Sequence, residues 1–328
     1  MTVPVITLSE IVRARDRIAP FVRVTPLVDV SEAAGRPLYL KCENLQHGGA
    51  FKIRGAFNMI AQLDRDRLRR GVITYSSGNH GQAVALAARE LGTRAVVVMP
   101  TTAPAVKVEG ARAFGAEVIF AGTTSADRHA RAEREAEARG LTIVPPFDHE
   151  WIIAGQATVG MEILDQRPDA AAVVVPIGGG GLAAGIAAAI GQSNPAIAIV
   201  GVEPAGSAAM HASLQAGTPV TLPRTASVAD GLLTLRPGEL TYAHVRQYVR
   251  GVVTVEEEAI VNAVLWTFSK AKLVAEPSGA AAIAGVLSGA IDTLGSIRGP
   301  VVAVVSGGNM DLDRFARFLQ EGGSWREK

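Results

Sequence analysis

Short apolar segments alternate with longer segments of helical periodicity along most of this chain. Residues 95–99, 172–175, 197–202 and 301–305 are brief runs of apolar residues. A strand buried on both faces gives such a run, whereas a strand with one face in water alternates apolar and polar residues. The alternation of such strands with helices predicts an α/β fold of parallel sheets covered by helices on both faces.

The pair Pro145–Pro146 interrupts this pattern near its middle. Proline cannot continue a helix or donate a hydrogen bond to a sheet, so the pair separates two blocks of strands and helices. The chain has 328 residues, enough for about two domains at about 100–200 residues each. We therefore predict two open, mostly parallel twisted sheets flanked by helices.

Two helices have marked sequence signals. The segment Thr7-Leu-Ser-Glu10 has the pattern of a capping box and predicts a helix that runs to about Ile18. A second helix is expected over 256–270, where apolar residues recur at helical spacing.

The composition excludes several classes of protein. The chain carries 32 Lys and Arg residues against 31 Asp and Glu residues, so a nucleic-acid partner that needs a basic surface is not expected. The single cysteine, Cys42, excludes a disulfide framework and is typical of a reducing compartment, which predicts a cytoplasmic location. The charge at Glu10 comes too early for the apolar region of a signal peptide.

The stretch 170–191 is uncharged and long enough to imitate a membrane span. Pro176 and the four glycines 178–181 would break a spanning helix in its middle. A buried strand, a glycine turn and a buried helix explain the same residues, so we expect no association with a membrane.

The glycine run lies between a predicted strand and a predicted helix. Ligands bind open parallel sheets beyond the carboxyl ends of the strands, where helix N-termini present free N–H groups. Four consecutive glycines let the backbone approach an anion with no Cβ in the way, which favours phosphate binding over a tight turn. The pattern Gly178-x-Gly180-x-x-Ala183, with Glu203 at the end of the next strand, also fits a dinucleotide site.

Polar residues gather at further element ends. One group follows the predicted strand at 72–75 and consists of Ser76, Ser77, Asn79 and His80. A helix N-cap would explain only one of these residues. Ser306 follows the strand at 301–305, where a plain turn is an equal alternative, and Lys52 starts a helix, where a lone lysine is usually a solvated cation. A dinucleotide site gives these residues no role, and a non-catalytic amino-acid sensor leaves Lys52 unexplained.

Taken together, these segments resemble the fold-type II pyridoxal-phosphate enzymes, and among them the serine racemases and the short, catabolic-type threonine/serine dehydratases. The similar segments are LKCENLQ at 40–46, AFKIRGA at 50–56, SSGNHGQA at 76–83, IAGQAT at 153–158, GGGG at 178–181, EPSGA at 276–280 and SGGN at 306–309. They occur in the family's order over nearly the whole chain. The resemblance implies a tryptophan synthase β-like fold with the active site between a large domain, 1–55 with 148–328, and a small mobile domain, 56–147.

The resemblance also implies which residues bind pyridoxal 5'-phosphate. Lys52 would hold the cofactor as a Schiff base, Asn79 would bond its ring hydroxyl, and Ser306 would meet its pyridine nitrogen. The complete implied set is Phe51, Lys52, Asn79, Gly178, Gly179, Gly180, Gly181, Leu182, Glu276 and Ser306. Burial and a cation-binding environment are expected to lower the pKa of Lys52, so that its amine can act as a base.

A second implied set binds the substrate. It consists of Ser76, Ser77, Asn79 and His80 around the carboxylate, together with Arg128, for which a solvated helical charge is an equal alternative. Ser77 stands where the racemases place a second base, opposite the lysine, so Lys52 and Ser77 are the predicted catalytic residues.

The chain departs from the family at several positions. Ala50 replaces a serine, and Gln46-His47-Gly48-Gly49 replaces the Lys-Thr-Gly of nucleotide-regulated racemases, so a nucleotide effector site is not expected. Glu203 matches one acidic ligand of the racemases' divalent cation, but Ala209 takes the place of its acidic partner. The resemblance therefore implies Glu203 only as a weak candidate for a Mg²⁺ or Mn²⁺ ligand.

The predicted function is an ammonia-lyase that converts L-threonine or L-serine to a 2-keto acid and ammonia by β-elimination, with Lys52 as the base. Serine racemase and 3-hydroxyaspartate dehydratase are alternatives, and an NAD-dependent amino-acid dehydrogenase is a more distant one. The expected partners are a small β-hydroxy amino acid and a second copy of the chain in a homodimer. Sequence alone does not rank the β-hydroxy amino acids.

Overall fold

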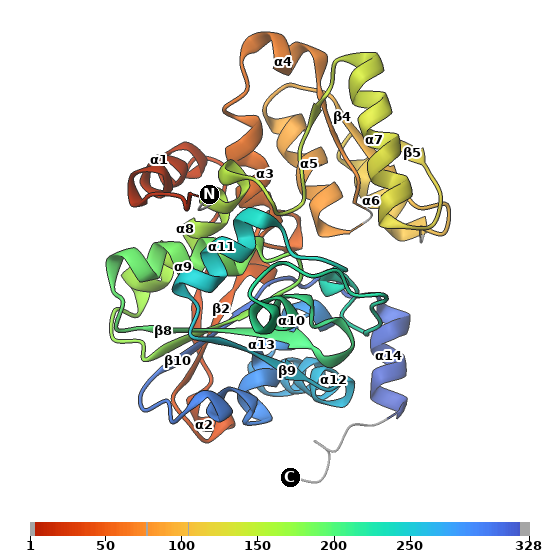
Figure 1. Ribbon diagram of the computed structural model, residues 1–328. Helices are drawn as coiled ribbons and strands as arrows, with labels where there is room; N and C mark the ends of the chain where they lie inside the picture. Colours follow the sequence, from red (N-terminus) through yellow and green to blue (C-terminus); the bar gives the residue numbers. More distant parts are fainter. Residues whose placement is uncertain (1–3, 77, 104, 322–328) are drawn as a thin grey trace.

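The computed structural model describes residues 4–76, 78–103 and 105–321, and their strands form two separate sheets (Figure 1). The larger sheet contains, in spatial order, β1 (Leu27–Asp29), β2 (Leu38–Cys42), β10 (Val301–Val305), β7 (Ala172–Pro176), β8 (Ala198–Pro204) and β9 (Gly251–Val255). The smaller sheet contains β5 (Glu117–Phe120), β4 (Ala95–Met99), β3 (Val72–Thr74) and β6 (Thr142–Ile143). Among these strands only β1 and β2 pair antiparallel, so the prediction of two mostly parallel sheets is confirmed.

The chain enters the larger sheet, leaves it to build the smaller one, and then returns. The early strand β2 pairs in parallel with β10, with Leu38 opposite Val301 and Cys42 opposite Val305. We call 72–143 the small-sheet unit, and 27–42 together with 172–321 the large-sheet unit. This division of the strands is compatible with the predicted domain boundaries at 55/56 and 147/148, which stay a prediction.

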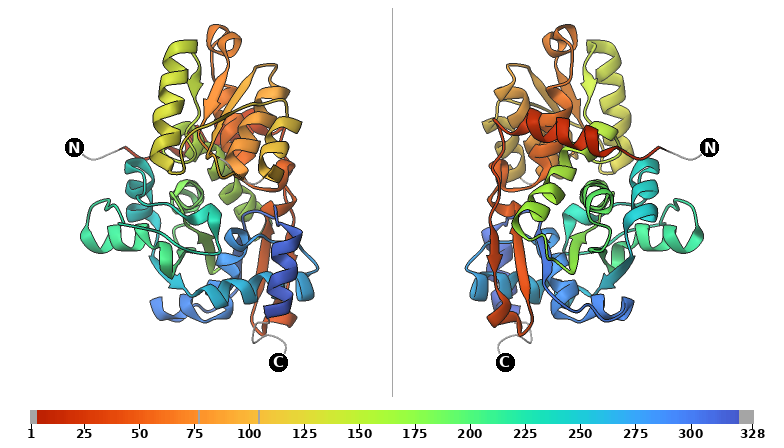
Figure 2. Two further views of the ribbon diagram at one scale, coloured as in Figure 1. Left: turned by 90° about the vertical axis from the view of Figure 1, so that its right-hand side faces the viewer. Right: turned by 90° about the vertical axis from the view of Figure 1, so that its left-hand side faces the viewer.

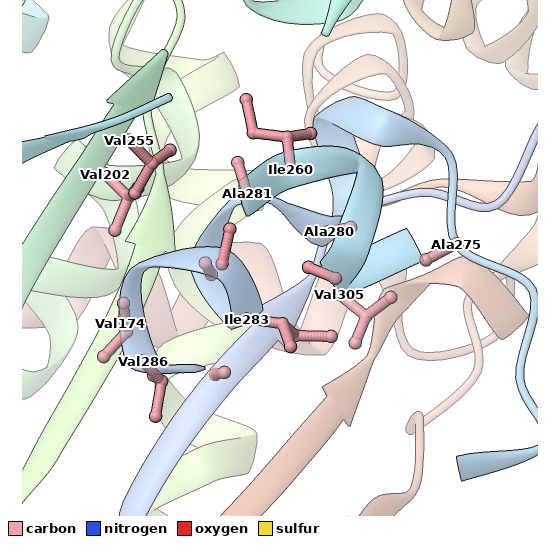
Figure 3. Close-up of a cluster of buried hydrophobic side chains, with 14 of the residues drawn as sticks. Val174, Val202, Val255, Ile260, Ala275, Ala280, Ala281, Ile283, Val286 and Val305 are labelled. Carbon is pink, nitrogen blue, oxygen red and sulfur yellow. The ribbon is translucent and has the colours of Figure 1, made fainter. Parts of the chain in front are cut away.

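Helices cover both faces of the larger sheet. α12 (Glu257–Trp266) and α13 (Pro277–Leu287) lie on one face, and α8 (Glu150–Gln166), α9 (Gly181–Ser193) and α11 (Glu239–Tyr248) lie on the other. Successive strand residues point to opposite faces, so Val174 packs with α13 whereas Val173 packs with α9. Figure 3 shows the apolar side chains on the face that α12 and α13 cover, where Val202 and Val305 lie close to residues of α13. Both faces are buried, as the continuous apolar runs predict.

The smaller sheet is covered in the same way. α3 (Lys52–Ile60), α5 (Asn79–Glu90) and α6 (Ala105–Ala113) lie on one face, and α7 (Ser125–Arg139) lies on the other. Every residue from Ile53 to Ile60 is buried, because α3 packs against both α5 and α8. α3 therefore connects the small-sheet unit to the helices of the larger sheet, as the two views of Figure 2 also show.

The remaining α-helices of the described residues are α1 (Leu8–Ile18), α2 (Ser31–Ala34), α4 (Arg65–Arg70), α10 (Ala209–Ala216) and α14 (Leu312–Glu321). α1 begins at the predicted capping box, in which the side chains of Thr7 and Glu10 each bond the other's backbone N–H. Over residues 4–321, apart from 77 and 104, no helix has both the length and the apolar character that a membrane span requires.

The prediction of one regular helix over 256–270 is wrong at its end, over 267–270. The α-helix α12 ends at Trp266, and a wider π-helical turn follows over Thr267–Ala271. Lys272 then adopts a left-handed conformation, with φ 58°, that ends the helix. The spacing of apolar residues does not distinguish this wider turn from a regular one, because both bury similar residues.

Candidate active site

A cavity of about 1030 Å³ lies between the two units, and it brings together most of the predicted site residues. The predicted residues that line it are Phe51, Lys52, Ser76, Asn79, His80, Arg128, Gly178, Gly179, Gly180, Gly181, Leu182, Glu276 and Ser306. They come from segments far apart in the sequence, as expected where strand ends and helix starts of two sheets converge. Glu203 does not line the cavity, and Ser77 lies outside the described residues.

Lys52 is the first residue of α3, and its partly buried side chain lines the cavity. The Nζ atom donates a hydrogen bond to the carbonyl oxygen of Pro146 at 2.6 Å and lies 5.1 Å from the centre of the Phe51 ring. Burial disfavours the charged ammonium and lowers the pKa of Lys52 to about 8. Burial is the cause of this shift. The amine is thus ready to lose its proton near neutral pH.

The glycine run forms the turn between β7 and α9. Gly180 has a φ of +96°, a left-handed conformation that favours glycine. A Cβ on Gly179 would lie 2.2 Å from a ring carbon of Phe147, so the ring occupies the space that a side chain would need. The first N–H groups of α9 have no partner within the helix, and the helix dipole favours an anion there. The turn therefore fits a phosphate group, and it also serves the packing of Phe147.

Asn79, at the start of α5, is held in one orientation by two neighbours. Its Nδ2 donates to Oε1 of Glu276 at 2.6 Å, and its Oδ1 accepts from Nδ2 of Asn309 at 2.8 Å. An amide nitrogen carries two hydrogens, and within the described residues the hydrogen bond to Glu276 uses one of them, so the other can serve a ligand in the cavity. Burial, with a smaller contribution from Asp230, raises the pKa of Glu276 to about 7.

Ser306 follows the last residue of β10 and is buried at the cavity wall. Its Oγ lies 3.4 Å from the carbonyl oxygen of Ser278, a long contact that leaves the hydroxyl free to rotate toward a better partner. A hydroxyl can donate to a ring nitrogen, but it cannot balance a protonated ring as a carboxylate does. No acidic side chain takes this place at the end of β10.

His80 is buried and neutral. Burial, with the nearby Lys52, lowers its pKa to about 3. The Nε2 atom lies 3.0 Å from the carbonyl oxygen of Val144, which can only accept, so Nε2 carries the ring hydrogen. Nδ1 is then an acceptor, and it has no partner among the described residues. The imidazole therefore cannot donate to a carboxylate in this orientation, so the predicted contact with the substrate carboxylate is limited to the backbone N–H of His80.

Arg128 reaches the cavity from α7 and is half-buried. Its Nη2 donates to Oγ of Ser125 at 2.8 Å, while its buried Nε has no hydrogen-bond partner in the described part of the chain. Burial lowers the pKa of Arg128, with the neighbouring Asp127 acting in the opposite direction. The guanidinium remains charged, because its pKa starts far above neutrality.

Glu203 has a structural role at the end of β8. Its two carboxylate oxygens accept hydrogen bonds from the backbone N–H groups of Met210 and His211, at 2.9 and 2.8 Å. Its burial raises its pKa to about 8. Within residues 4–321, apart from 77 and 104, no three His, Cys, Asp or Glu side chains lie together in a way that could hold a metal ion. In the described residues Glu203 thus holds the start of α10, and its role as a divalent-cation ligand stays a prediction.

Sequence reasoning missed several residues that line the same cavity, among them Lys107, Asp230, Asn309 and Arg314. Asn309 ends the SGGN segment and was within reach of a motif argument. The charged residues had no such signal, because Lys107 and Asp230 are 123 residues apart and meet only in the folded chain.

One cavity thus holds a buried amine, a glycine turn suited to a phosphate and a hydroxyl at a strand end, which match the aldehyde, phosphate and ring nitrogen of pyridoxal phosphate. Residues 18–307 match the family model described as pyridoxal-phosphate dependent enzyme. The chain belongs to this family.

Named relatives of this pyridoxal-phosphate dependent enzyme include lyases and racemases. It is 43% identical over 312 residues to the L-threonine ammonia-lyase of Geobacter sulfurreducens, covering 94% of this chain and 77% of the relative. Maize serine racemase superimposes with a TM-score of 0.91 at 38% identity, covering 97% of this chain and 98% of the racemase. A pyridoxal 5'-phosphate-dependent aspartate racemase superimposes with a TM-score of 0.87 at 32% identity, covering 95% of this chain and 99% of that one.

Proposed function

We propose that this enzyme is an ammonia-lyase that converts L-threonine and L-serine to a 2-keto acid and ammonia. The observation that carries the proposal is the buried amine of Lys52 in the same cavity as the glycine turn and Ser306. The likeness to a threonine ammonia-lyase over most of the chain supports the same reaction. On this proposal the cofactor set is the one predicted from the sequence, with Gly178–Gly181 and Leu182 at the phosphate.

The hydroxyl of Ser306 favours elimination. When bound, pyridoxal phosphate supplies an aldehyde that condenses with amines and a pyridine ring that takes up the electron pair left at Cα. A serine hydroxyl next to the ring nitrogen makes this uptake weaker than a carboxylate would. A weak electron sink suits a reaction in which a β-leaving group departs as soon as Cα loses its proton.

Lys52 is the base on this proposal. Its pKa of about 8 leaves a large fraction of the amine neutral at pH 7.5 to 8, so it can accept the Cα proton of the substrate. The β-hydroxyl then takes up a proton and leaves as water. The enamine that is released adds water in solution and divides into a 2-keto acid and ammonia, so the atoms of the amino acid are conserved.

The test is to incubate the purified holoenzyme with a panel of β-hydroxy amino acids and to measure keto acid, ammonia and D-enantiomer. We expect keto acid and ammonia in equal amounts from L-threonine or L-serine. Lys52→Ala should lack the visible absorbance of the holoenzyme and should lower turnover by about 10³-fold. A colourless wild-type protein with full activity, or oxidation of substrate linked to NAD, would contradict the proposal.

Racemisation is a second candidate activity, which the likeness to maize serine racemase supports. Ser77, predicted as the second base, lies outside the described residues. Ser77→Ala should spare elimination and lower formation of D-serine by about 10²-fold, since positioned bases contribute at least this much. An equal loss of both activities would show that Ser77 is not a separate base.

Arg128 favours acidic substrates such as 3-hydroxyaspartate as a further candidate. The other lysines and arginines that line the cavity in the described residues have a carboxylate or carbonyl partner: Lys52 with Pro146, Lys107 and Arg314 with Asp230, and Arg236 with Glu239. Arg128 bonds only a serine hydroxyl and is thus available to a second carboxylate. Arg128→Met should raise the KM for 3-hydroxyaspartate about tenfold more than that for serine.

We further propose that the enzyme is a cytoplasmic homodimer. The buried, unpaired thiol of Cys42, whose pKa burial raises to about 12, is compatible with a reducing compartment. Analytical ultracentrifugation tests the oligomeric state, and a monomer at micromolar concentration would contradict it.

A further inference from the structure

Two opposite charges meet at the wall of the cavity. Lys107 lies on α6 of the small-sheet unit, and Asp230 lies in a 3-10 turn, Asp230–Leu232, of the large-sheet unit. The Nζ atom of Lys107 is 2.6 Å from Oδ2 of Asp230, and both residues line the cavity. In Figure 1, α6 and α14 lie one above the other at the same side of the molecule.

This contact differs in kind from the other ion pairs of the protein. Among the ion pairs of the described residues, Lys107–Asp230 alone joins the small-sheet unit to the large-sheet unit. The two hydrogen bonds of Asn79 to Glu276 and Asn309 also connect the units. The donors of those two bonds are neutral amides, so Lys107–Asp230 is the contact between the units in which both partners are charged.

A second cation lies behind Asp230. The Nη1 atom of Arg314, on α14, is 3.6 Å from Oδ1 of Asp230, the oxygen that Lys107 does not use. Arg314 belongs to the large-sheet unit, so it stays with Asp230 if the two units separate. Lys107, whose side chain is 32% exposed, would then enter water, and Asp230 would keep a partner. In the separated state Asp230 therefore keeps a cation beside it, and the charge of Lys107 is solvated.

The relative position of the two units determines the geometry of the site. Asn79, His80 and Arg128 reach the cavity from the small-sheet unit, while the glycine turn and Ser306 belong to the large-sheet unit. The reaction requires these groups in their assembled positions. A contact that favours the closed position changes the fraction of molecules in which the site is assembled, without touching the substrate and without changing the closed geometry.

We propose that Lys107 and Asp230 are positioning residues, a charge latch that holds the small-sheet unit closed over the cavity and releases it for substrate entry and product release. In its catalytic consequence this inference rests on the proposed function. An exposed ion pair shifts an equilibrium by up to about five-fold, equivalent to about 1 kcal/mol. Such a latch favours closure and still opens readily, as a lid that must admit a substrate requires.

The first experiment measures closure without any substrate. Hydroxylamine captures the aldehyde of the cofactor and removes it from the holoenzyme, and the loss of visible absorbance gives the rate. We expect Lys107→Ala to increase this rate about five-fold, since a larger fraction of molecules is open. Lys107→Arg keeps the charge and should stay close to wild type. Arg112→Ala, an exposed arginine on the same helix that does not line the cavity, is the matched control and should not change the rate.

Salt and a double-mutant cycle separate the latch from a general loss of stability. High NaCl should bring the wild-type rate toward that of Lys107→Ala, while the variant itself should respond little, because screening acts on the charge pair. Asp230→Asn should raise the rate as Lys107→Ala does, and the double variant should be no faster than either single variant. Additive effects, an unchanged rate in Lys107→Ala, or an equal increase in Arg112→Ala would overturn the proposal.

Steady-state kinetics then tests the catalytic consequence. Lys107→Ala should raise the KM for the β-hydroxy amino acid about five-fold and leave kcat within about two-fold, because the variant loses closure and retains its reacting groups. A large fall in kcat at unchanged KM would contradict a latch. If the enzyme turns over no β-hydroxy amino acid, the proposed function fails, whereas the hydroxylamine experiment still decides the latch.

Discussion

At the scale of single residues, the site depends on groups whose state is set by their neighbours. Asn79 donates to Glu276 and accepts from Asn309, so the orientation of its amide follows from two residues of other elements. His80 is fixed as an acceptor at Nδ1 because Nε2 faces a carbonyl oxygen. The sequence predicts that both residues line the site. It does not predict the direction of their hydrogen bonds, because that depends on partners 64 to 230 residues away.

The ionisation of Glu276 gives a prediction for stability. Burial raises its pKa from 4.5 to about 7, so the folded protein binds more protons than the unfolded chain between these pH values. Stability that the protonated carboxyl provides is full below pH 4.5 and is lost as the pH rises through 7. The loss at pH 8 amounts to as much as about 3 kcal/mol, at about 1.4 kcal/mol per unit of pKa.

Glu276→Gln removes this ionisation and keeps an oxygen that can accept from Asn79. We expect the variant to melt at a higher temperature than wild type at pH 8 and at a similar temperature at pH 5. Calorimetry of the holoenzyme at the two pH values measures the difference. A gap between the two proteins that is independent of pH would mean that Glu276 stays ionised in the fold.

At the scale of elements, the segments that resemble the family also contain residues that hold the fold together, in addition to residues that bind the cofactor. Arg54 is fully buried and bonds Glu43 at 2.8 Å and Glu162 at 2.6 Å, and Lys41 also bonds Glu162 at 2.6 Å. These contacts tie β2 and the start of α3, which carries Lys52, to α8. The segments 40–46 and 50–56 were identified through the family resemblance, but their buried ion cluster was not predicted, because no spacing rule pairs residues of a strand and two helices.

Arg54→Met is expected to destabilise the protein by about 3–5 kcal/mol, since it leaves the buried carboxylate of Glu43 without its ion-pair partner and Glu162 with Lys41 alone. The exposed pair of Arg36 and Asp292, at 2.9 Å, provides the control. Arg36→Met should cost less than about 1 kcal/mol. Urea unfolding of the two variants gives the comparison, and similar costs would show that the buried cluster contributes no more than a surface pair.

Alanine substitutions at two glycines, one of them in the turn between β7 and α9, separate the effect of backbone strain on stability from the effect on cofactor binding. Gly180 has a φ of +96° and lines the cavity, whereas Gly217 has a φ of +73° at the end of α10 and does not. An alanine at either position should cost about 1–2 kcal/mol of stability because of the left-handed backbone. Gly180→Ala should cost more than Gly217→Ala, because its Cβ would lie 2.9 Å from side-chain atoms of Met210 and Thr241, whereas the space at Gly217 is open. Only Gly180→Ala should also weaken cofactor binding, by about tenfold or more, through a displaced N–H donor. Titration of the apoprotein with pyridoxal phosphate tests this, and equal affinities would argue against a phosphate at the turn.

At the scale of the whole molecule, the alternation of strands and helices was enough to predict two mostly parallel sheets, because each strand bears its own pattern of burial. The assignment of β2 to the larger sheet was implied only by the family resemblance. The sequence also gave no account of how the two units meet. That contact depends on α3, which packs against both α5 and α8, and on Lys107 and Asp230, which line the cavity.

Because the cavity lies between the units, we expect the cofactor to stabilise both of them together. Most of the predicted cofactor residues belong to the large-sheet unit, but Asn79 is at the start of α5 in the small-sheet unit. Adding pyridoxal phosphate to the apoprotein should therefore slow amide hydrogen exchange in α5 and α6 as well as in α9. Inorganic phosphate is the control, since it fills the glycine turn alone and should slow exchange only near α9. Protection by the cofactor that is confined to the large-sheet unit would show that the two units move independently and that closure does not accompany binding.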